Sequence, residues 1–201
     1  MLIIEGPDAV GKTTFAQKCV EYMREYQPDL PVIGQAFGML PAKWDYYADY
    51  LPYVTPYAVM DRFVMSEVAY GAVCRNRVGF VTQDRLNRVQ AELDRVASFT
   101  VVITAATDDD MRELFLRAKE KRPEEFKVEQ VVRVNQAFSE LVDGEEIECG
   151  SECFKCRSNM YLSVTADRYS GDDAVKRACD RWTSRLMNRL TDLRAMTRRA
   201  L

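Results

Sequence analysis

The stretch Gly6-Pro7-Asp8-Ala9-Val10-Gly11-Lys12-Thr13 decides the fold. Two glycines five positions apart precede a lysine and a hydroxyl residue, which is the spacing of a loop that wraps phosphate groups. In such a loop, backbone N–H groups curl around phosphate oxygens, the lysine reaches the outer phosphates and the hydroxyl binds Mg²⁺. The pattern predicts that ATP phosphates are bound by Gly6, Asp8, Ala9, Val10, Gly11, Lys12, Thr13 and Thr14.

The residues on both sides of this loop support the same interpretation. Before it, the apolar run 2–4 predicts a buried parallel strand. After it, residues 14–23 predict a helix whose apolar side carries Phe15, Cys19 and Met23. The helix would then direct the partial positive charge of its N-terminus toward the bound phosphates. A chance glycine turn would not be expected to have a strand and a helix in these places.

Composition limits the other possibilities. A chain of 201 residues is predicted to form a single domain, and 47% apolar with 29% charged residues is ordinary for a globular protein. The net charge of −3 gives no overall attraction to nucleic acid, and no apolar run reaches the length of a membrane span. The absence of histidine excludes histidine acid–base chemistry and histidine metal ligands. With the chain entering a core strand at once, we expect no signal peptide and a cytoplasmic location, with reduced cysteines.

A second segment places charged residues at a strand end. Residues 57–60 predict a short apolar strand, which is followed by Asp61 and Arg62. Ligands bind at the carboxyl ends of parallel strands in open α/β sheets. Asp61 could therefore orient Mg²⁺, and the planar fork of Arg62 could hold a phosphate, although a surface ion pair is the alternative.

With these two segments, nearly the whole chain resembles the thymidylate kinases, and within them the compact phage-type relatives. The motifs that carry the resemblance are Gly-Pro-Asp-x-x-Gly-Lys-Thr-Thr, Asp61-Arg62-Phe63 and Ser-x-x-Ala-Tyr at 66–70. The resemblance implies an α/β, three-layer P-loop kinase fold with a central parallel sheet, and ATP-dependent phosphorylation of a deoxynucleoside monophosphate. It implies that Arg62 binds the acceptor phosphate, that Asp61 supports metal and catalysis, and that Tyr70 packs on the deoxyribose. It also suggests a homodimer.

Three departures from the family pattern bear on the substrate. Ala9 stands where the family usually has glycine, and the usual Arg-Glu-Pro-Gly-Gly stretch is replaced by residues 35–41. Glu67 stands where the family has an amide that reads the thymine edge. A carboxylate only accepts hydrogen bonds, so Glu67 could accept from thymine N3–H but would suit a base with an amino group at least as well. Arg75, a few residues on, could neutralise substrate phosphate or belong to a solvated turn.

The segment 117–128 corresponds to the mobile lid of this kinase family. The phosphate loop contains no arginine, and members of that kind supply cationic groups from the lid, so the resemblance makes Arg117 and Arg122 catalytic candidates. The physical reason is that phosphoryl transfer depends on positioning and on charge stabilisation of the transferred oxygens. The alternative is an ordinary helix end with cations near its C-terminus.

Residues 143–159 form an insertion of unusual composition. Cys149, Cys153 and Cys156 give a C-x₃-C-x₂-C spacing. Three thiolates could bind Zn²⁺ if another ligand completed the site, but the segment has no fourth cysteine and no histidine. Reduced cysteines without metal are the alternative interpretation.

The basic end of the last helix leaves a second function open. Residues 172–201 predict a helix with several arginines near its end, which could be solvated or could contact nucleic acid. The first hypothesis is phosphorylation of dTMP to dTDP with ATP and Mg²⁺. The second keeps the phosphoryl chemistry but moves the acceptor to DNA, as in phage relatives that phosphorylate hydroxymethylated pyrimidines (5-hydroxymethyluracil type). The third is a non-enzymatic ATP-binding switch.

Overall fold

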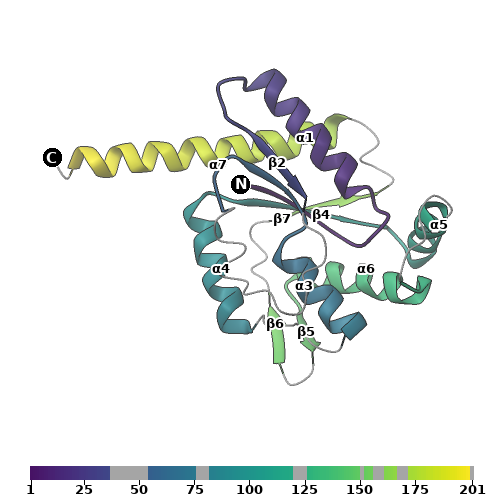
Figure 1. Ribbon diagram of the computed structural model, residues 1–201. Coiled ribbons are helices and arrows are strands. Elements are labelled where there is room, and N and C mark those ends of the chain that lie inside the picture. Colours follow the sequence, from purple (N-terminus) through teal and green to yellow (C-terminus); the bar gives the residue numbers. More distant parts are fainter. Residues whose placement is uncertain are drawn as a thin grey trace.

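The computed structural model describes residues 1–36, 54–75, 82–119, 126–149, 152–155, 161–166 and 172–199 (Figure 1). The strands are β1 (Leu2–Glu5), β2 (Ile33–Ala36), β3 (Ala58–Asp61), β4 (Phe99–Thr104), β5 (Glu146–Cys149), β6 (Glu152–Lys155) and β7 (Tyr161–Thr165). The helices are α1 (Lys12–Tyr26), α3 (Val64–Tyr70), which continues as a π-helical turn (Gly71–Arg75), α4 (Gln83–Arg95), α5 (Asp108–Lys119), α6 (Val128–Asp143) and α7 (Asp172–Arg199).

Five of these strands form the central sheet, in the order β2-β3-β1-β4-β7. All its strand pairs are parallel. The middle strand, β1, is buried along its whole length, which explains why its sequence is an unbroken apolar run up to Glu5. The predicted α/β class, with a central parallel sheet between helices, is therefore confirmed.

Helices cover both faces of this sheet. On one face, α1 and α7 pack together, and Ile4 of the sheet belongs to the same core cluster as Trp182 of α7. On the other face, Ile3 belongs to a cluster with Leu86 of α4 and Phe138 of α6. Adjacent residues of β1 thus point into different cores, as the alternation of a strand requires. Figure 1 shows the sheet edge-on between these layers, with α7 extending beyond it.

The sheet order determines where a ligand can bind. After β1 the chain builds β2 and β3 on one side, and then crosses to the other side to build β4 and β7. Ligands in open α/β sheets bind outside the carboxyl ends of the strands where this reversal occurs. The register pairs Ile4 with Asp61, so the end of β3 lies level with the start of the phosphate loop.

The insertion contains a hairpin that we did not predict from the sequence. Strands β5 and β6 pair antiparallel, with Ile147 opposite Phe154. Both of these side chains are buried in the core cluster that includes α4 and α6. The segment 143–159 is thus partly a packed cover of the core. Of the predicted lid, Arg117 to Lys119 belong to α5, and Arg122 lies outside the described residues.

Gly6 is required where β1 turns into the loop. Its φ is +140°, and a Cβ added there would lie 2.1 Å from the carbonyl oxygen of Ile103. Because this neighbour is backbone of the sheet, the clash cannot be relieved by a side-chain rotation. We expect Gly6→Ala to lower the free energy of unfolding by about 3 kcal/mol or more in urea titrations. Gly34→Ala is the control, since among the described residues its Cβ would meet the Val20 side chain, at 3.1 Å, and no backbone atom; equal losses for both variants would contradict the prediction.

Candidate active site

The phosphate loop connects the buried end of β1 to α1. Gly6, Ala9 and Gly11 all have positive φ, at 140°, 70° and 84°. Ala9 therefore adopts the left-handed conformation that glycine usually occupies, at a cost of about 1–2 kcal/mol. The loop keeps its turn despite the missing glycine.

Thr13 and Asp61, the two residues for which the sequence suggested magnesium binding, lie side by side. The Thr13 hydroxyl donates to Asp61 Oδ2 at 2.5 Å. Asp61 Oδ1 is buried and has no hydrogen-bond partner among the described residues. A hydroxyl and a carboxylate oxygen with an unused lone pair are ligands that suit Mg²⁺, which usually takes its other ligands from water and substrate phosphates. The donor set therefore fits the ion, with Thr13 and Asp61 as the residues that would hold it.

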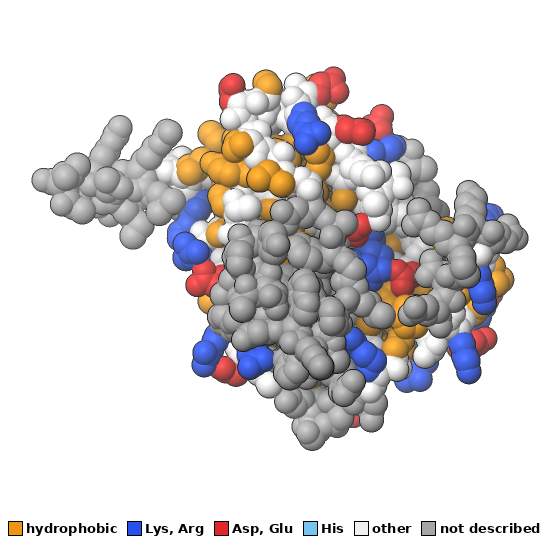
Figure 2. Space-filling model, viewed as in Figure 1, with side chains coloured by type: hydrophobic (Ala, Val, Ile, Leu, Met, Phe, Trp, Pro, Cys, Tyr) orange, Lys and Arg blue, Asp and Glu red, His pale blue; other side chains and the backbone are white. Residues whose placement is uncertain are grey.

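Open space adjoins this pair. A cavity of about 310 Å³ lies between α1 and the β2–β3 side of the sheet, and Thr13 and Asp61 are part of its lining. Ala16, Val20 and Val59 give it an apolar wall. Figure 2 shows hydrophobic side chains gathered over α1 and β2 on the face in view. The Thr13–Asp61 pair is thus accessible to a ligand from one side.

Lys12 is buried within the loop. Its Nζ donates to the carbonyl oxygen of Pro7, so the side chain folds back over the loop. Burial, together with the positive charge of Arg62, lowers the pKa of Lys12 to about 8. An added phosphate would favour the protonated form, because opposite charges stabilise each other strongly in a buried place. Lys12 therefore places its ammonium group against the backbone of the loop.

Arg62 reaches the phosphate loop from the end of β3. Its guanidinium forms a salt bridge with Asp8, and it lies 5.3 Å from the centre of the Tyr70 ring. The Tyr70 hydroxyl donates to the other Asp8 oxygen at 2.8 Å. Burial raises the pKa of Tyr70 well above its usual value, so this hydroxyl remains a donor. Arg62 Nη1 is buried without a partner among the described residues, and this spare donor suits a phosphate oxygen.

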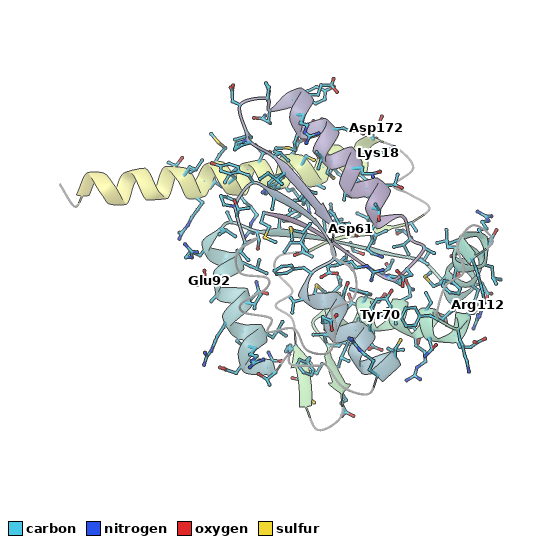
Figure 3. The ribbon with its side chains drawn as sticks, in the orientation of Figure 1. Lys18, Asp61, Tyr70, Glu92, Arg112 and Asp172 are labelled. Carbon is cyan, nitrogen blue, oxygen red and sulfur yellow. The ribbon has the colours of Figure 1, made fainter. Side chains whose placement is uncertain are left out.

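The cluster of Asp8, Arg62 and Tyr70 joins the two segments that the sequence singled out. Asp8 was predicted among the ATP-binding residues, and the structure turns its side chain toward Arg62 and Tyr70. Figure 3 labels Asp61, at the carboxyl end of β3, and Tyr70, on α3. The loop, Asp61 and Arg62 therefore meet at one end of the sheet.

Glu67 and Arg75 form an ion pair that the sequence did not predict. Arg75 Nη2 donates to Glu67 Oε2 at 2.8 Å and to the Glu67 carbonyl oxygen at 3.3 Å. The Glu67 side chain is only 8% exposed, so this positive partner compensates its buried charge. One residue of the pair accepts hydrogen bonds and the other donates them. Together, the two side chains can both donate and accept hydrogen bonds, which a carboxylate alone cannot do.

Glu5 is the functional candidate that sequence analysis missed. Its Oε1 accepts hydrogen bonds from the backbone N–H groups of Phe63, Met65 and Ser66 at 2.9, 3.0 and 3.4 Å. Its Oε2 accepts from the Ser66 hydroxyl at 2.5 Å. The only sequence signal is a carboxylate at the end of an apolar strand.

The titration of Glu5 predicts a pH dependence of stability. Burial raises the pKa of Glu5 from 4.5 to about 7, against the opposing effects of Ser66, Arg62 and the backbone donors. The positive charge of Lys12 also interacts with the Glu5 carboxylate. Because the folded form holds the proton more tightly, stability falls as pH rises from about 4.5 through about 7, by about 3 kcal/mol.

The glutamine of the variant Glu5→Gln cannot lose a proton, so the fall in stability between about pH 4.5 and about pH 7 should be absent in this variant. Relative to wild type, its free energy of unfolding should rise between about pH 5 and about pH 8. Urea titrations at the two pH values measure the difference. Parallel stability curves for the two proteins would contradict the assigned titration.

Of the remaining predicted residues, Arg117, Cys149 and Cys153 lie on elements other than those that form the site, and Arg122 lies outside the described residues. Arg117 is on α5, where it is 69% exposed and paired with Glu113. In the hairpin, Cys153 lies opposite Glu148 and Cys149 opposite Glu152. Because facing positions alternate along a strand, Cys149 and Cys153 occupy opposite faces of the hairpin. Cys156 lies outside the described residues.

This register favours cysteines that do not share a metal ion. We expect Cys149→Ser to leave kcat/KM within about twofold of wild type, since Cys149 lies on β5, outside the elements that form the site. Steady-state kinetics and the metal content of the purified protein test this prediction. Stoichiometric zinc that is lost from the serine variant would contradict it.

Comparison with solved structures supports the fold. The YorR protein of Bacillus subtilis, solved in complex with phosphorylated GDP, superposes with a TM-score of 0.63 at 16% sequence identity. The match covers 88% of this chain and 91% of YorR. No protein-family model matches the chain. Comparison with curated proteins likewise gives no match.

The shared fold agrees with the central parallel sheet and its flanking helices. In the described part of the chain, no helix has both the length and the apolar character that crossing a membrane requires.

Proposed function

We propose that this protein is a thymidylate kinase-like enzyme that transfers the γ-phosphoryl group of ATP to a deoxynucleoside monophosphate, converting dTMP to dTDP. The observation that carries the proposal is the meeting of Arg62 with the phosphate loop. Arg62 contacts Asp8 of the loop, and Thr13 of α1 contacts Asp61, the residue next to Arg62. A donor phosphate in the loop and an acceptor phosphate on Arg62 would therefore be neighbours, as transfer between them requires.

Each residue of the site would have a separate role in phosphoryl transfer. Lys12 would bind the outer phosphates of ATP and stabilise charge on the transferred oxygens. Thr13 and Asp61 would hold Mg²⁺, which neutralises phosphate charge when it is bound. Arg62 would hold the acceptor phosphate with its planar fork. Arg117 and Arg122 remain the candidates for a further source of positive charge.

The acceptor side is consistent with a pyrimidine deoxynucleotide. Glu67 could accept a hydrogen bond from thymine N3–H, while Arg75 could donate to the neighbouring carbonyl. Tyr70 would pack against the sugar. The Glu67–Arg75 pair thus supplies an acceptor and a donor where the family has a single amide.

A second acceptor is favoured by one feature of α7. The end of this helix is rich in arginine, at positions 185, 189, 194, 198 and 199. Basic side chains on one helix neutralise DNA phosphates, so hydroxymethylated pyrimidines within DNA are the second candidate substrate.

One assay separates these functions. Purified protein is incubated with Mg²⁺, radiolabelled ATP and each deoxynucleoside monophosphate in turn, or with duplex DNA that contains 5-hydroxymethyluracil. The proposal predicts labelled dTDP as the main product. Labelled DNA without dTDP would favour the second candidate, and label in neither acceptor would indicate a nucleotide-binding protein without this kinase activity.

A further inference from the structure

We propose that Glu5 is a positioning residue for acceptor binding, because its carboxylate fixes the segment 62–66 from which Arg62 reaches the phosphate loop. The inference rests on the proposed function for the identity of the acceptor. The contacts of Glu5 with this segment stand independently of it.

The segment needs such support because Arg62 has an unfavourable backbone conformation. Its φ is +73°, in the left-handed region that costs about 1–2 kcal/mol for a residue with a side chain. Residues in this region persist only where their surroundings impose the conformation. One constraint comes from β1, since the Arg62 N–H donates to the carbonyl oxygen of Ile4 at 2.8 Å.

Glu5 supplies the constraints that follow along the chain. Phe63 precedes α3 and has no side-chain group that can bond to the first turn of this helix. The carboxylate of Glu5 takes that place and binds the N–H groups of Phe63, Met65 and Ser66. The Ser66 hydroxyl completes the set. A single side chain of β1 thus holds three residues of the acceptor segment.

Because of its position in the sequence, Glu5 connects the phosphate loop with the segment that carries Arg62. Glu5 is the last residue of β1, and the phosphate loop begins at the next residue. The phosphate loop is therefore joined covalently to β1, and the segment that carries Arg62 is hydrogen-bonded to the last residue of the same strand. The distance between the two phosphate-binding groups is fixed by this connection and by the sheet register that pairs Ile4 with Asp61.

The surroundings of Glu5 distinguish this role from proton transfer. The residue is 0% exposed, and both of its carboxylate oxygens are already engaged by neutral donors of the chain. A side chain so enclosed does not reach the acceptor phosphate of a substrate. Its effect must pass through Arg62, which identifies it as a positioning residue.

Three variants separate hydrogen bonding from charge. Glu5→Gln keeps a carbonyl oxygen for the three N–H groups, and its amide can donate to the Ser66 hydroxyl. Glu5→Met has a similar length but cannot accept these bonds. Glu5→Asp keeps the charge and withdraws the carboxylate by one methylene. Leu141→Ala, in a fully buried part of α6, is the control for a general loss of stability.

Steady-state kinetics should show a selective effect on the acceptor. In Glu5→Met, the KM for dTMP should rise at least about tenfold, while the KM for ATP stays within about twofold. Glu5→Gln should resemble wild type, Glu5→Asp should resemble the methionine variant, and Leu141→Ala should change neither KM. An equal rise in both KM values, or a normal Glu5→Asp enzyme beside an impaired Glu5→Gln enzyme, would overturn the inference.

A readout without substrate separates this inference from the proposed function. Hydrogen exchange at the amides of Phe63, Met65 and Ser66 should accelerate at least about tenfold in Glu5→Asp and remain slow in Glu5→Gln. Unchanged exchange in Glu5→Asp would overturn the positioning role, whatever the enzyme phosphorylates. Accelerated exchange in a protein that does not phosphorylate dTMP would instead reject the proposed acceptor and keep the role of Glu5 in fixing the segment. This measurement needs only the aspartate and glutamine variants, so it applies even if Glu5→Met does not fold.

Discussion

Replacing Arg62 by alanine should lower kcat/KM for the acceptor nucleotide at least about 100-fold, because the change removes a charged contact to the acceptor phosphate, whose oxygen attacks the transferred group. The guanidinium is held against Asp8 and Tyr70, and its Nη1 has no partner among the described residues. The binding of ATP should change much less, since the phosphate loop itself is intact. Initial rates at varied dTMP and varied ATP measure the two effects.

The unusual backbone of Arg62 provides a matched control. Glycine adopts a φ of +73° without strain, whereas alanine does not. Arg62→Gly and Arg62→Ala both lack the guanidinium, so their kinetic losses should agree even though the glycine variant should be more stable. Near-normal turnover by either folded variant would remove the acceptor-site assignment.

Replacing Lys12 by alanine should also lower kcat/KM at least about 100-fold, because a buried cation inside the phosphate loop stabilises charge that develops on the transferred group. Lys12 is only 5% exposed and folds over the loop onto the carbonyl oxygen of Pro7. Its loss should affect kcat as well as ATP binding, whereas the loss of Arg62 should act mainly through the acceptor.

Lys18 of the same helix is the control for this experiment. It lies on the outer side of α1, where it pairs with Asp172 of α7 at 3.5 Å (Figure 3). An exposed pair of this kind contributes little to stability, and Lys18→Ala should retain wild-type kinetics. If the Lys12 and Lys18 variants were equally active, Lys12 would have no role in transfer.

The fold could be predicted from the sequence because its decisive features are local. The glycines of the loop, the apolar run of β1 and the periodic side of α1 lie within the first 26 residues. Asp61 and Arg62 could be placed at a strand end for the same reason. The structure adds that these local features meet at one end of the sheet.

The parts that could not be predicted depend on contacts between distant residues. Glu5 binds Phe63, Met65 and Ser66, and nothing in the sequence near Glu5 indicates these partners. The pairing of Glu67 with Arg75 similarly requires knowing that a π-helical turn follows α3.

The hairpin is a different case, because its signal was present in the sequence. In β5, Ile147 stands between two glutamates, which is the alternation of a half-buried strand, whereas in β6 Phe154 stands between Cys153 and Lys155. The cysteine spacing suggested metal binding, although the alternation of the same segment places positions 149 and 153 on opposite faces of the hairpin.

The most direct test of the central claim is calorimetric binding of adenosine and thymidine joined through five phosphates. If the loop and Arg62 hold a donor and an acceptor side by side, this molecule should bind once per chain and at least about 100-fold more tightly than dTMP. Arg62→Ala should weaken the binding of this molecule, because the contact to its acceptor half is lost while its donor half still binds the loop. Binding no tighter than that of dTMP, or an affinity that the loss of Arg62 does not change, would contradict the account.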